Sequence, residues 1–171
     1  MNTEGTLNEG PGRFRALVEA AADAVVCLDA PGKISFWNQK AGELFGYSAN
    51  EAIGLMLHDL IVPERYRAKM QHGLDEFFSN GKGDIIGRTI ELAALKKSGE
   101  EFPVELSVAA FEMDGAWHAI GIVRDITERK RQGEELKKGI AEMERMNKLM
   151  VGRELKMEEL REEVRALRQR L

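Results

Sequence analysis

The division of the chain into an aromatic part and a long tail without aromatic residues or prolines limits its folding more than any other feature. All 11 aromatic residues lie between Phe14 and Trp117, and all four prolines lie between Pro11 and Pro103. Residues 128–171 carry 13 Lys+Arg and 10 Asp+Glu, a net charge of +3, whereas the preceding residues carry 12 and 19, a net charge of −7. The sequence therefore predicts one globular domain followed by a charged extension.

The two parts meet in the stretch GIVRDITERKRQ, residues 121–132. Its first three residues are typical of a strand, and the charged helix begins four residues later with no Gly or Pro between them. Asp125 or Thr127 can accept hydrogen bonds from the free backbone N–H groups at the helix start. A strand joined directly to a stiff helix transmits displacement, whereas a Gly/Ser linker would absorb it. We therefore expect a signal relay through Asp125, Ile126 and Thr127.

The pattern of apolar residues predicts how the chain is organised. Residues 1–10 are polar and glycine-rich and are expected to be disordered, and helical spacing predicts an N-terminal helix over 11–22. Two strands and several short helices follow, and then three longer strands are predicted over Ile85–Lys96, Glu101–Glu112 and Ala116–Asp125. This order indicates an α+β core over 23–126 with one five-stranded antiparallel sheet. Residues 127–171 form the C-terminal helix in this interpretation.

Four segments of the sequence carry a family resemblance. ISFWNQKAGELFGYSANEAIG, VPERYRAKMQHGLDEF, LKKSGEEFPVELSV and IGIVRDITERK resemble successive segments of PAS domains, the sensory modules of bacterial signalling proteins. The resemblance covers about residues 13–130. It implies the PAS fold, with short helices on one face of the sheet, an N-terminal cap helix and a pocket for a cofactor or small metabolite. It also implies that Asp125-Ile126-Thr127 is the motif at which many PAS domains pass into an exit helix.

The tail contains a heptad pattern. Position a falls on Leu136, Met143, Met150, Met157, Val164 and Leu171, and position d falls on Gly139, Met146, Arg153, Leu160 and Leu167. This pattern predicts a coiled-coil seam that is sound after Met157 and weak between Gly139 and Arg153. We expect a parallel homodimer through this seam, and the alternative is a helix that packs back on its own domain. The weak part is hypothesised to hold two registers, as a switch requires.

Cofactor chemistry depends on residues in the short helices. Covalent flavin binding in light-sensing PAS relatives uses a Cys, and residues 54–60 contain none. Haem-binding PAS relatives carry a proximal His where this chain has Met70, and His72 lies about 200° further around the helix. Met70 and His72 therefore remain cofactor-binding candidates, but a core Met and a surface His are the favoured interpretation. Besides His72, the residues that the pattern predicts to line a pocket, each of them favoured as a plain core residue, are Val26, Leu28, Phe45, Ile53, Leu60, Met70, Leu74, Phe77, Ile90, Leu92, Leu106 and Ile122.

Several classes of function are disfavoured by the sequence. It contains no P-loop, no HExxH and no Cys-x-x-Cys motif, and the tail has no His that could accept a phosphoryl group, so no enzyme is predicted. The acidic core argues against nucleic acid as a partner. No apolar run approaches the roughly 20 residues needed to cross a bilayer. The single cysteine, Cys27, excludes an internal disulfide and suits a reducing compartment, so a cytoplasmic location is expected.

These observations favour a sensory module that dimerises and relays a ligand or redox signal through its C-terminal coiled coil. By family analogy, the output domain is a histidine kinase or a cyclic-dinucleotide enzyme outside residues 1–171. Two alternatives remain open at this point. One is a haem-binding gas or redox sensor, and the other is a dimerisation scaffold without a ligand.

Overall fold

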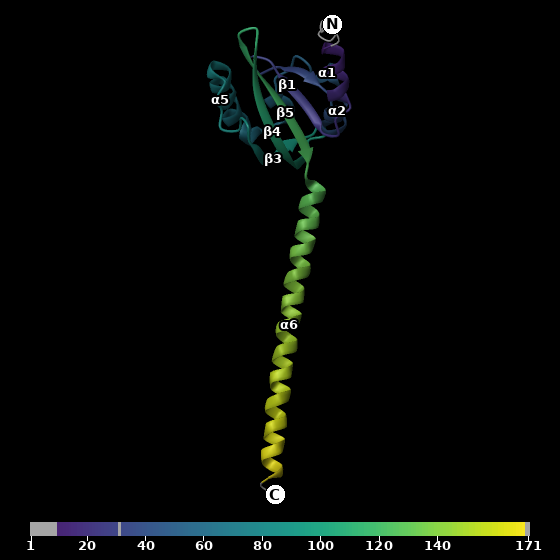
Figure 1. The fold of residues 1–171 in the computed structure, drawn as a ribbon, viewed down its shortest axis with the longest axis vertical. Coiled ribbons are helices and arrows are strands. Elements are labelled where there is room, and N and C mark those ends of the chain that lie inside the picture. The colour runs from purple at the N-terminus through teal and green to yellow at the C-terminus, as the bar shows by residue number, and fades with distance from the viewer. Residues whose placement is uncertain (1–9, 31, 170–171) are drawn as a thin grey trace, which may run out of the picture. The chain divides into compact units, whose positions relative to one another are not determined.

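The computed structural model describes residues 10–30 and 32–169 (Figure 1). Most of the segment 1–10, which the sequence predicts to be disordered, lies outside these residues. The chain divides after Thr127 into two compact units, and each is described by itself. The first unit contains helices α1 to α5 and strands β1 to β5. In chain order these are α1 (Gly10–Glu19), β1 (Ala24–Leu28), β2 (Ile34–Trp37), α2 (Gln39–Phe45), α3 (Ala49–Ala52), α4 (Leu57–Ile61), α5 (Glu64–Asn80), β3 (Thr89–Leu95), β4 (Glu101–Met113) and β5 (Ala116–Asp125).

The five strands form one antiparallel sheet in the order β2-β1-β5-β4-β3. This confirms the predicted fold class. The last strand in the sequence, β5, is the central strand of the sheet, with β1 on one side and β4 on the other. In one row across the three strands, Gly121 is paired with Val26 and with Val108. Any change in the position of β5 therefore acts on hydrogen bonds along both of its edges.

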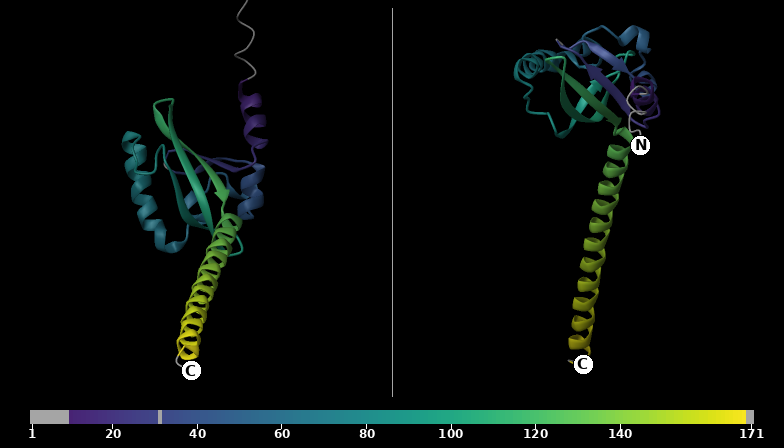
Figure 2. Two further views of the ribbon diagram at one scale, coloured as in Figure 1. Left: turned by 60° about the horizontal axis from the view of Figure 1, so that its bottom comes forward. Right: turned by 45° about the horizontal axis from the view of Figure 1, so that its top comes forward.

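The helices flank the sheet on two sides in both views (Figures 1 and 2). Helices α1 and α2 lie beside β1, and α5 lies at the opposite flank of the sheet. Alternate residues of each strand face the core, because side chains along a strand point to opposite faces. On β4 the inward residues are Phe102, Val104, Leu106 and Val108, as the alternation in the sequence predicts.

The third strand starts later than the sequence predicts. The run from Ile85 was expected to be strand, but residues 85–88 form a turn in which the Arg88 backbone N donates to the Ile85 carbonyl at 3.2 Å. Gly87 adopts a positive φ of 71°, which a residue with a side chain rarely adopts, and its N–H donates to the Val108 carbonyl. The prediction of a strand at Ile85 was therefore wrong. The apolar character of this run has another cause, because Ile86 packs against the core from a turn.

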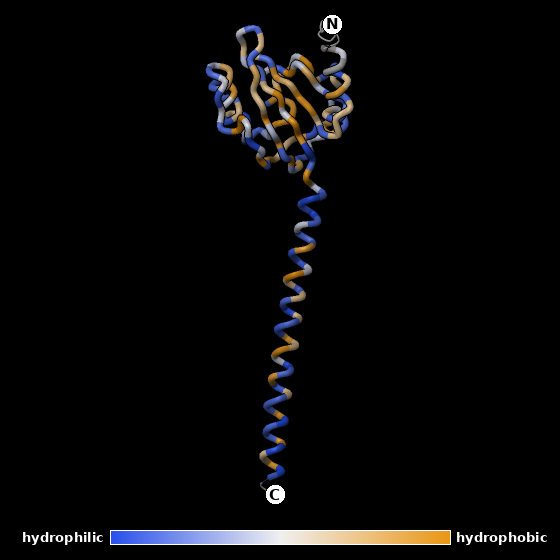
Figure 3. The backbone as a smooth tube through the Cα atoms, in the orientation of Figure 1, coloured by the Kyte–Doolittle hydropathy of each residue, from blue (hydrophilic) through white to orange (hydrophobic). Residues whose placement is uncertain are grey.

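The second unit is a single long helix, α6, from Thr127 to Arg168. None of its described residues is buried. Apolar residues recur along it among hydrophilic ones (Figure 3). Leu171, the last predicted seam residue, lies outside the described residues. No described helix is long and apolar enough to cross a membrane.

Candidate functional site

The inner face of the sheet has a tightly packed half, which lies around β1, β2 and α2. The Phe45 ring packs at a tilt against Trp37 on one side and Phe102 on the other, with ring centroids 5.4 and 5.9 Å apart. Phe45 is fully buried, and the Trp37 indole Nε1 donates to the Tyr47 carbonyl at 3.1 Å. Val26 and its neighbours on β1 are also buried. This half is filled by the protein's own side chains, so it serves as the rigid base of the domain.

The other half of the inner face is incompletely covered. Leu106 pairs with Ile90 on β3 and with Val123 on β5, which places Ile90 and Leu106 on the core side of the sheet. Leu92 and Val108 share this face by alternation, and all four side chains are half-buried. Half-buried apolar side chains gain further burial when another apolar group contacts them.

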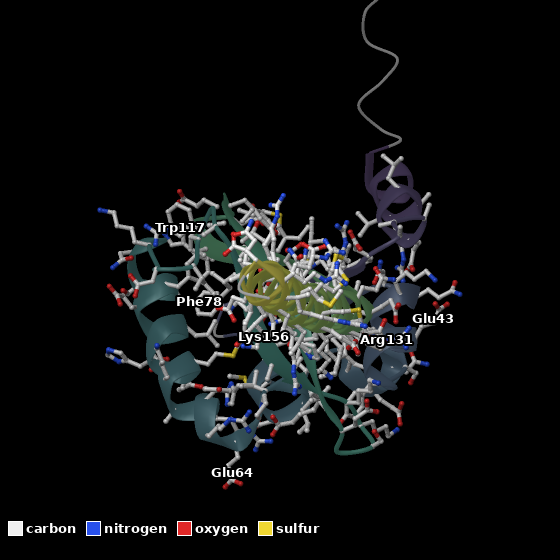
Figure 4. All side chains as sticks on the ribbon, turned by 90° about the horizontal axis from the view of Figure 1, so that it is seen from below. Glu43, Glu64, Phe78, Trp117, Arg131 and Lys156 are labelled. Atoms are coloured by element: carbon white, nitrogen blue, oxygen red, sulfur yellow. The ribbon has the colours of Figure 1, made fainter. Side chains whose placement is uncertain are left out.

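Helix α5 supplies the opposite side of this surface. Leu74 and Phe78 pack against the core cluster, and Met70 lies one turn before Leu74 on the same helical face and is also half-buried. Phe78 and Trp117 lie near each other on the α5 side of the domain, away from Glu43 of α2 (Figure 4). We name the half-buried apolar surface between α5 and the sheet the interior site, and define it as Met70, Leu74, Ile90, Leu92, Leu106, Val108 and Gly121.

Gly121 gives the interior site its shape at the central strand. It lies in the middle of β5, where a glycine weakens a strand and commonly marks a close approach by another group. A Cβ at this position would lie 3.4 Å from Leu106 Cδ1 and 3.8 Å from the Val26 carbonyl oxygen. A side chain larger than a methyl group would therefore occupy the space in front of β5.

Five of the eight residues that the sequence predicts most specifically to bind a cofactor are half-buried apolar residues of α5, β3 and β4, and three others are not. Met70, Leu74, Ile90, Leu92 and Leu106 belong to the interior site. Phe45 lies in the packed half, and His72 is exposed on α5. The prediction for Ile122 was wrong, because Ile122 pairs with Ser107 and Val25 on the outer face and is 43% exposed.

Among the other residues predicted to line the pocket, one is exposed and the remaining four lie in the hydrophobic core. Ile53 is 46% exposed, because it is the C-cap of the short helix α3 and its backbone has left the helical conformation. Val26, Leu28, Leu60 and Phe77 are buried in the core cluster. The sequence analysis did not place Gly121 and Val108 in the pocket. The alternation on β4 indicates that Val108 faces inward. The inward residue on β5 is Gly121, one position before the predicted Ile122.

The histidines bear on the haem alternative. His72 is exposed, and His118 is on the outer face, where its ring stacks on Phe111 with centroids 5.4 Å apart. His58 lies on α4, and its Nδ1 is buried with no hydrogen-bond partner among the described residues. Met70 on α5 is half-buried. The described residues contain no group of three or more His, Cys, Asp or Glu side chains that could hold a metal ion.

The exit from the sheet is tightly held. Asp125 Oδ1 accepts from the Thr127 backbone N at 2.7 Å, so Asp125 is the residue that caps the start of α6. Ile126 is buried, and its backbone N donates to the Pro103 carbonyl at 3.1 Å. These two hydrogen bonds thus hold residues 126 and 127 to the ends of β4 and β5.

An ion pair connects this exit to the segment that follows α1. Arg124 Nε and Nη2 donate to the two carboxylate oxygens of Asp23 at 2.9 and 2.7 Å. The hydrogen bond from Arg124 lowers the pKa of the Asp23 carboxyl below its ordinary value. Asp23 and Arg124 are 101 residues apart in the sequence, but they are neighbours because β1 and β5 are antiparallel partners.

Asn38 holds α1 to the same end of the sheet. Its side chain is buried, and its Oδ1 accepts from the backbone N atoms of Val25 and Ala41, both at 2.9 Å. Its Nδ2 donates to the carbonyls of Val18 at 3.0 Å and Asp23 at 3.1 Å. One amide therefore connects α1, the segment before β1, β1 itself and the start of α2.

Comparison with known proteins agrees with this architecture. The family model for the PAS fold matches residues 12–126. This chain belongs to the PAS family. A solved PAS domain from Colwellia psychrerythraea is 28% identical, with a TM-score of 0.57, and the match covers 68% of this chain and 97% of that one. PAS domains are sensory modules.

Two curated relatives carry the names of a sensor protein and of a histidine kinase. The sensor protein FixL of Bradyrhizobium diazoefficiens is 27% identical over 146 residues, which are 85% of this chain and 29% of FixL. The cell-division control histidine kinase PdhS of Brucella ovis is 32% identical over 134 residues, which are 77% of this chain and 12% of PdhS. The chain therefore spans less than a third of the length of these relatives.

Proposed function

We propose that this PAS module senses an apolar small molecule at the interior site and relays its binding through β5 into α6. The observation that carries the proposal is the position of β5. The central strand presents Gly121 to the interior site and continues through the capped turn at Asp125 directly into α6. A ligand against Gly121 would displace the strand whose end positions the helix.

The chemistry of the interior site supports an uncharged ligand. Its defining side chains come from Met, Leu, Ile and Val, and none of them can donate a conventional hydrogen bond. A charged group placed there would lose its hydration without gaining a partner, whereas an aliphatic or aromatic group would gain contacts. The half-buried side chains would complete their burial on the ligand, which favours binding by the hydrophobic effect.

We extend the proposal to a parallel homodimer formed through α6. The apolar residues of the predicted seam that the structure describes are Leu136, Met143, Met146, Met150, Met157, Leu160, Val164 and Leu167, and each is about half exposed or more in the single chain. A helix of this length with an uncovered apolar stripe at heptad spacing is typical of a coiled coil. In a parallel pair Glu163 would face Arg168 of the second chain, whereas Lys156 would face Arg161 of the same sign, so charge does not settle the orientation.

The names of the relatives support a histidine kinase as the output domain. Because the chain spans only part of FixL and PdhS, the output would lie outside residues 1–171. We place the module in the cytoplasm within this proposal, since its single cysteine, Cys27, is a free buried thiol that suits a reducing compartment.

The test is a binding measurement on the purified 171-residue chain with the apolar fluorescent probe N-phenyl-1-naphthylamine. We expect saturable binding, and we expect Gly121→Val to weaken it at least tenfold by filling the space in front of β5. Ile122→Val is the matched control, because it alters the neighbouring residue on the outer face. Equal binding by wild type and Gly121→Val would contradict an interior ligand and favour the scaffold alternative.

An absorption spectrum of the same sample, before and after incubation with haem, addresses the remaining alternative. With Met70 at the position of the proximal ligand, we expect absorbance from the protein alone. A Soret band that shifts with carbon monoxide would show that the ligand is haem and not an apolar metabolite. Met70 and His72 would then be the first residues to substitute.

A further inference from the structure

Helix α6 carries a second stripe of residues, on the side that the proposed seam leaves in solvent. In a pair of helices joined at positions a and d, positions c and f lie on the opposite side of each helix. On α6 these positions advance by alternate steps of four and three residues, and all of them are exposed in the single chain. We name them the outer stripe, which consists of Lys138, Ala141, Arg145, Lys148, Gly152, Leu155, Glu159, Glu162, Ala166 and Gln169.

The charges of the outer stripe are separated along the helix. Its charged residues before Gly152 are all basic, and those after Leu155 are all acidic. Like charges three residues apart destabilise a helix slightly, and Arg145 with Lys148 is such a pair, as is the acidic pair that follows Leu155. The stripe therefore gains nothing from its own charges, and it would be stabilised by opposite charges from another surface.

A second copy of the outer stripe in the antiparallel direction supplies these charges. When the two-fold axis passes between residues 153 and 154, Arg145 lies opposite Glu162, and Lys148 lies opposite Glu159. A parallel copy would instead place each basic residue beside its own counterpart, which is repulsive. The charges of the outer stripe thus settle its orientation, whereas those beside the seam do not.

The uncharged residues of the outer stripe match in size under the same two-fold axis. Gly152 lies opposite Leu155, which is 64% exposed in the single chain. A glycine lets another group approach the helix backbone closely, so the leucine side chain has a place to pack. Ala141 lies opposite Ala166 in the same way, and small residues at a contact shorten the distance between two helices. Val151, which is 49% exposed, flanks the central contact.

We propose that the outer stripe is a contact surface for a second copy of itself, through which two coiled-coil pairs associate antiparallel into an assembly of four chains. The association rests on the proposed parallel homodimer, which buries the seam and leaves the outer stripe free. Only Leu155 and the flanking Val151 contribute large apolar side chains, so the contact belongs to the small, weak class of interfaces. We therefore expect it at millimolar and not at micromolar concentration of the chain.

Sedimentation equilibrium of the 171-residue chain, from micromolar to millimolar concentration, tests this association. We expect the mass to rise from two chains towards four. Arg145→Glu and Glu162→Arg should each weaken the rise at least tenfold, because like charges would then face each other, and the double variant should restore it. The exchange is made at these positions because Glu159 also pairs with Lys156 of its own helix at 2.9 Å.

Arg161→Glu is the matched control. It reverses a charge at position e, on a side of α6 that the outer stripe does not occupy. In the parallel pair it also replaces the repulsion from Lys156 of the second chain by attraction, so it does not weaken the homodimer. We expect the same rise in mass for this variant as for the wild type.

Disulfide crosslinking tests the antiparallel orientation. In a Cys27→Ala background, a chain with Lys148→Cys is mixed at millimolar concentration with a chain that carries Glu159→Cys, and the mixture is oxidised. Residue 148 faces residue 159 in the antiparallel contact, whereas two copies of either residue are separated by about 16 Å along the helix. We expect at least tenfold more crosslinking in the mixture than with either chain alone.

The outcomes separate this inference from the proposed function. A wild-type mass that stays at two chains up to millimolar concentration would overturn the contact through the outer stripe and leave the homodimer standing. Association that persists equally in Arg145→Glu, or that the double variant does not restore, would likewise overturn it, since another surface would then join the pairs. A chain that is monomeric over the whole range would overturn the homodimer, and this contact with it.

Discussion

The two units of this chain obtain their order in opposite ways. The sensory unit buries its aromatic residues, pairs all five strands and satisfies its buried amide Asn38 with four hydrogen bonds. Helix α6 has no buried residue among those described, and its ion pairs join residues three or four positions apart, as between Arg131 and Glu128. Such exposed pairs contribute only about 0.3–0.5 kcal/mol each. The comparison teaches that the sensory unit is ordered by contacts within itself, whereas the described residues of α6 include no buried side chain.

The largest expected effect is in the packed half of the sensory unit. Phe45→Ala removes the ring that contacts Trp37 and Phe102, and we expect it to lower the free energy of unfolding by about 3–5 kcal/mol. Urea unfolding followed by tryptophan fluorescence measures this loss. Ile122→Ala, on the outer face, should lower it by less than half as much. A similar loss in both variants would contradict the assignment of the two faces.

Asn38→Ala should have the next largest effect, because it leaves the buried N–H groups of Val25 and Ala41 without their acceptor. An unsatisfied buried donor costs about 1–3 kcal/mol, so we expect a loss in that range. Hydrogen exchange should show that α1 loses protection more than β4 does. Uniform loss over the whole unit would show that Asn38 supports the core rather than the attachment of α1.

Gly81→Ala tests the contact between the end of α5 and the first residues of β5. A Cβ on Gly81 would lie 2.3 Å from Trp117 Cε2, and the residue has a φ of 71°. We expect the free energy of unfolding to fall by about 1–3 kcal/mol, since both the clash and the backbone conformation disfavour a side chain. Gly99→Ala shares the positive φ, of 86°, but has open space around it, so thermal unfolding should show a smaller loss. Equal losses would mean that Trp117 moves aside freely.

The smallest expected effect is the pH dependence of stability that comes from one ion pair on the surface. A hydrogen bond from Lys97, with further bonds from Ser48, lowers the pKa of Glu51 to about 2 from an ordinary value of 4.5. Since the pKa is lower in the folded state, the stabilisation is present above pH 4.5 and is lost as the pH falls towards 2. In the Glu51→Gln variant, the urea concentration at the midpoint of unfolding should change less with pH in this window.

Lys97→Met should flatten the same part of that curve, and the double variant should add little to either single change. Independent, additive effects would contradict the pairing of Glu51 with Lys97. Because the pair ties α3 to the turn between β3 and β4, these variants should leave association through α6 unchanged.

The fold followed from local patterns, whereas the site depended on pairings that the sequence does not show. Alternation on β4 and the stop signals around Gly81 predicted strands and helices well. The triplet Gly121-Ile122-Val123 has apolar residues at adjacent positions, so alternation alone could not decide which one faces inward. Its pairing decided it, with Val123 opposite Leu106 and Ile122 opposite Ser107.

The polar links were beyond the reach of sequence patterns for a similar reason. Asp23 and Arg124 are ordinary charged residues until β1 and β5 are placed side by side. No sequence pattern indicates the role of Asn38, because its four hydrogen bonds join elements that are 13 to 20 residues away as well as its own helix. Such roles emerge from tertiary contacts.

The most direct test of the central claim is the mass of the chain in solution, measured by sedimentation equilibrium over a range of micromolar concentrations, for the wild type and for Leu160→Glu. We predict a wild-type mass of twice the chain mass of 19.2 kDa. For Leu160→Glu we predict a monomer whose sensory unit unfolds at the same urea concentration and whose helical signal is reduced. A wild-type chain that remains monomeric with α6 fully helical would contradict the dependence of α6 on a second copy.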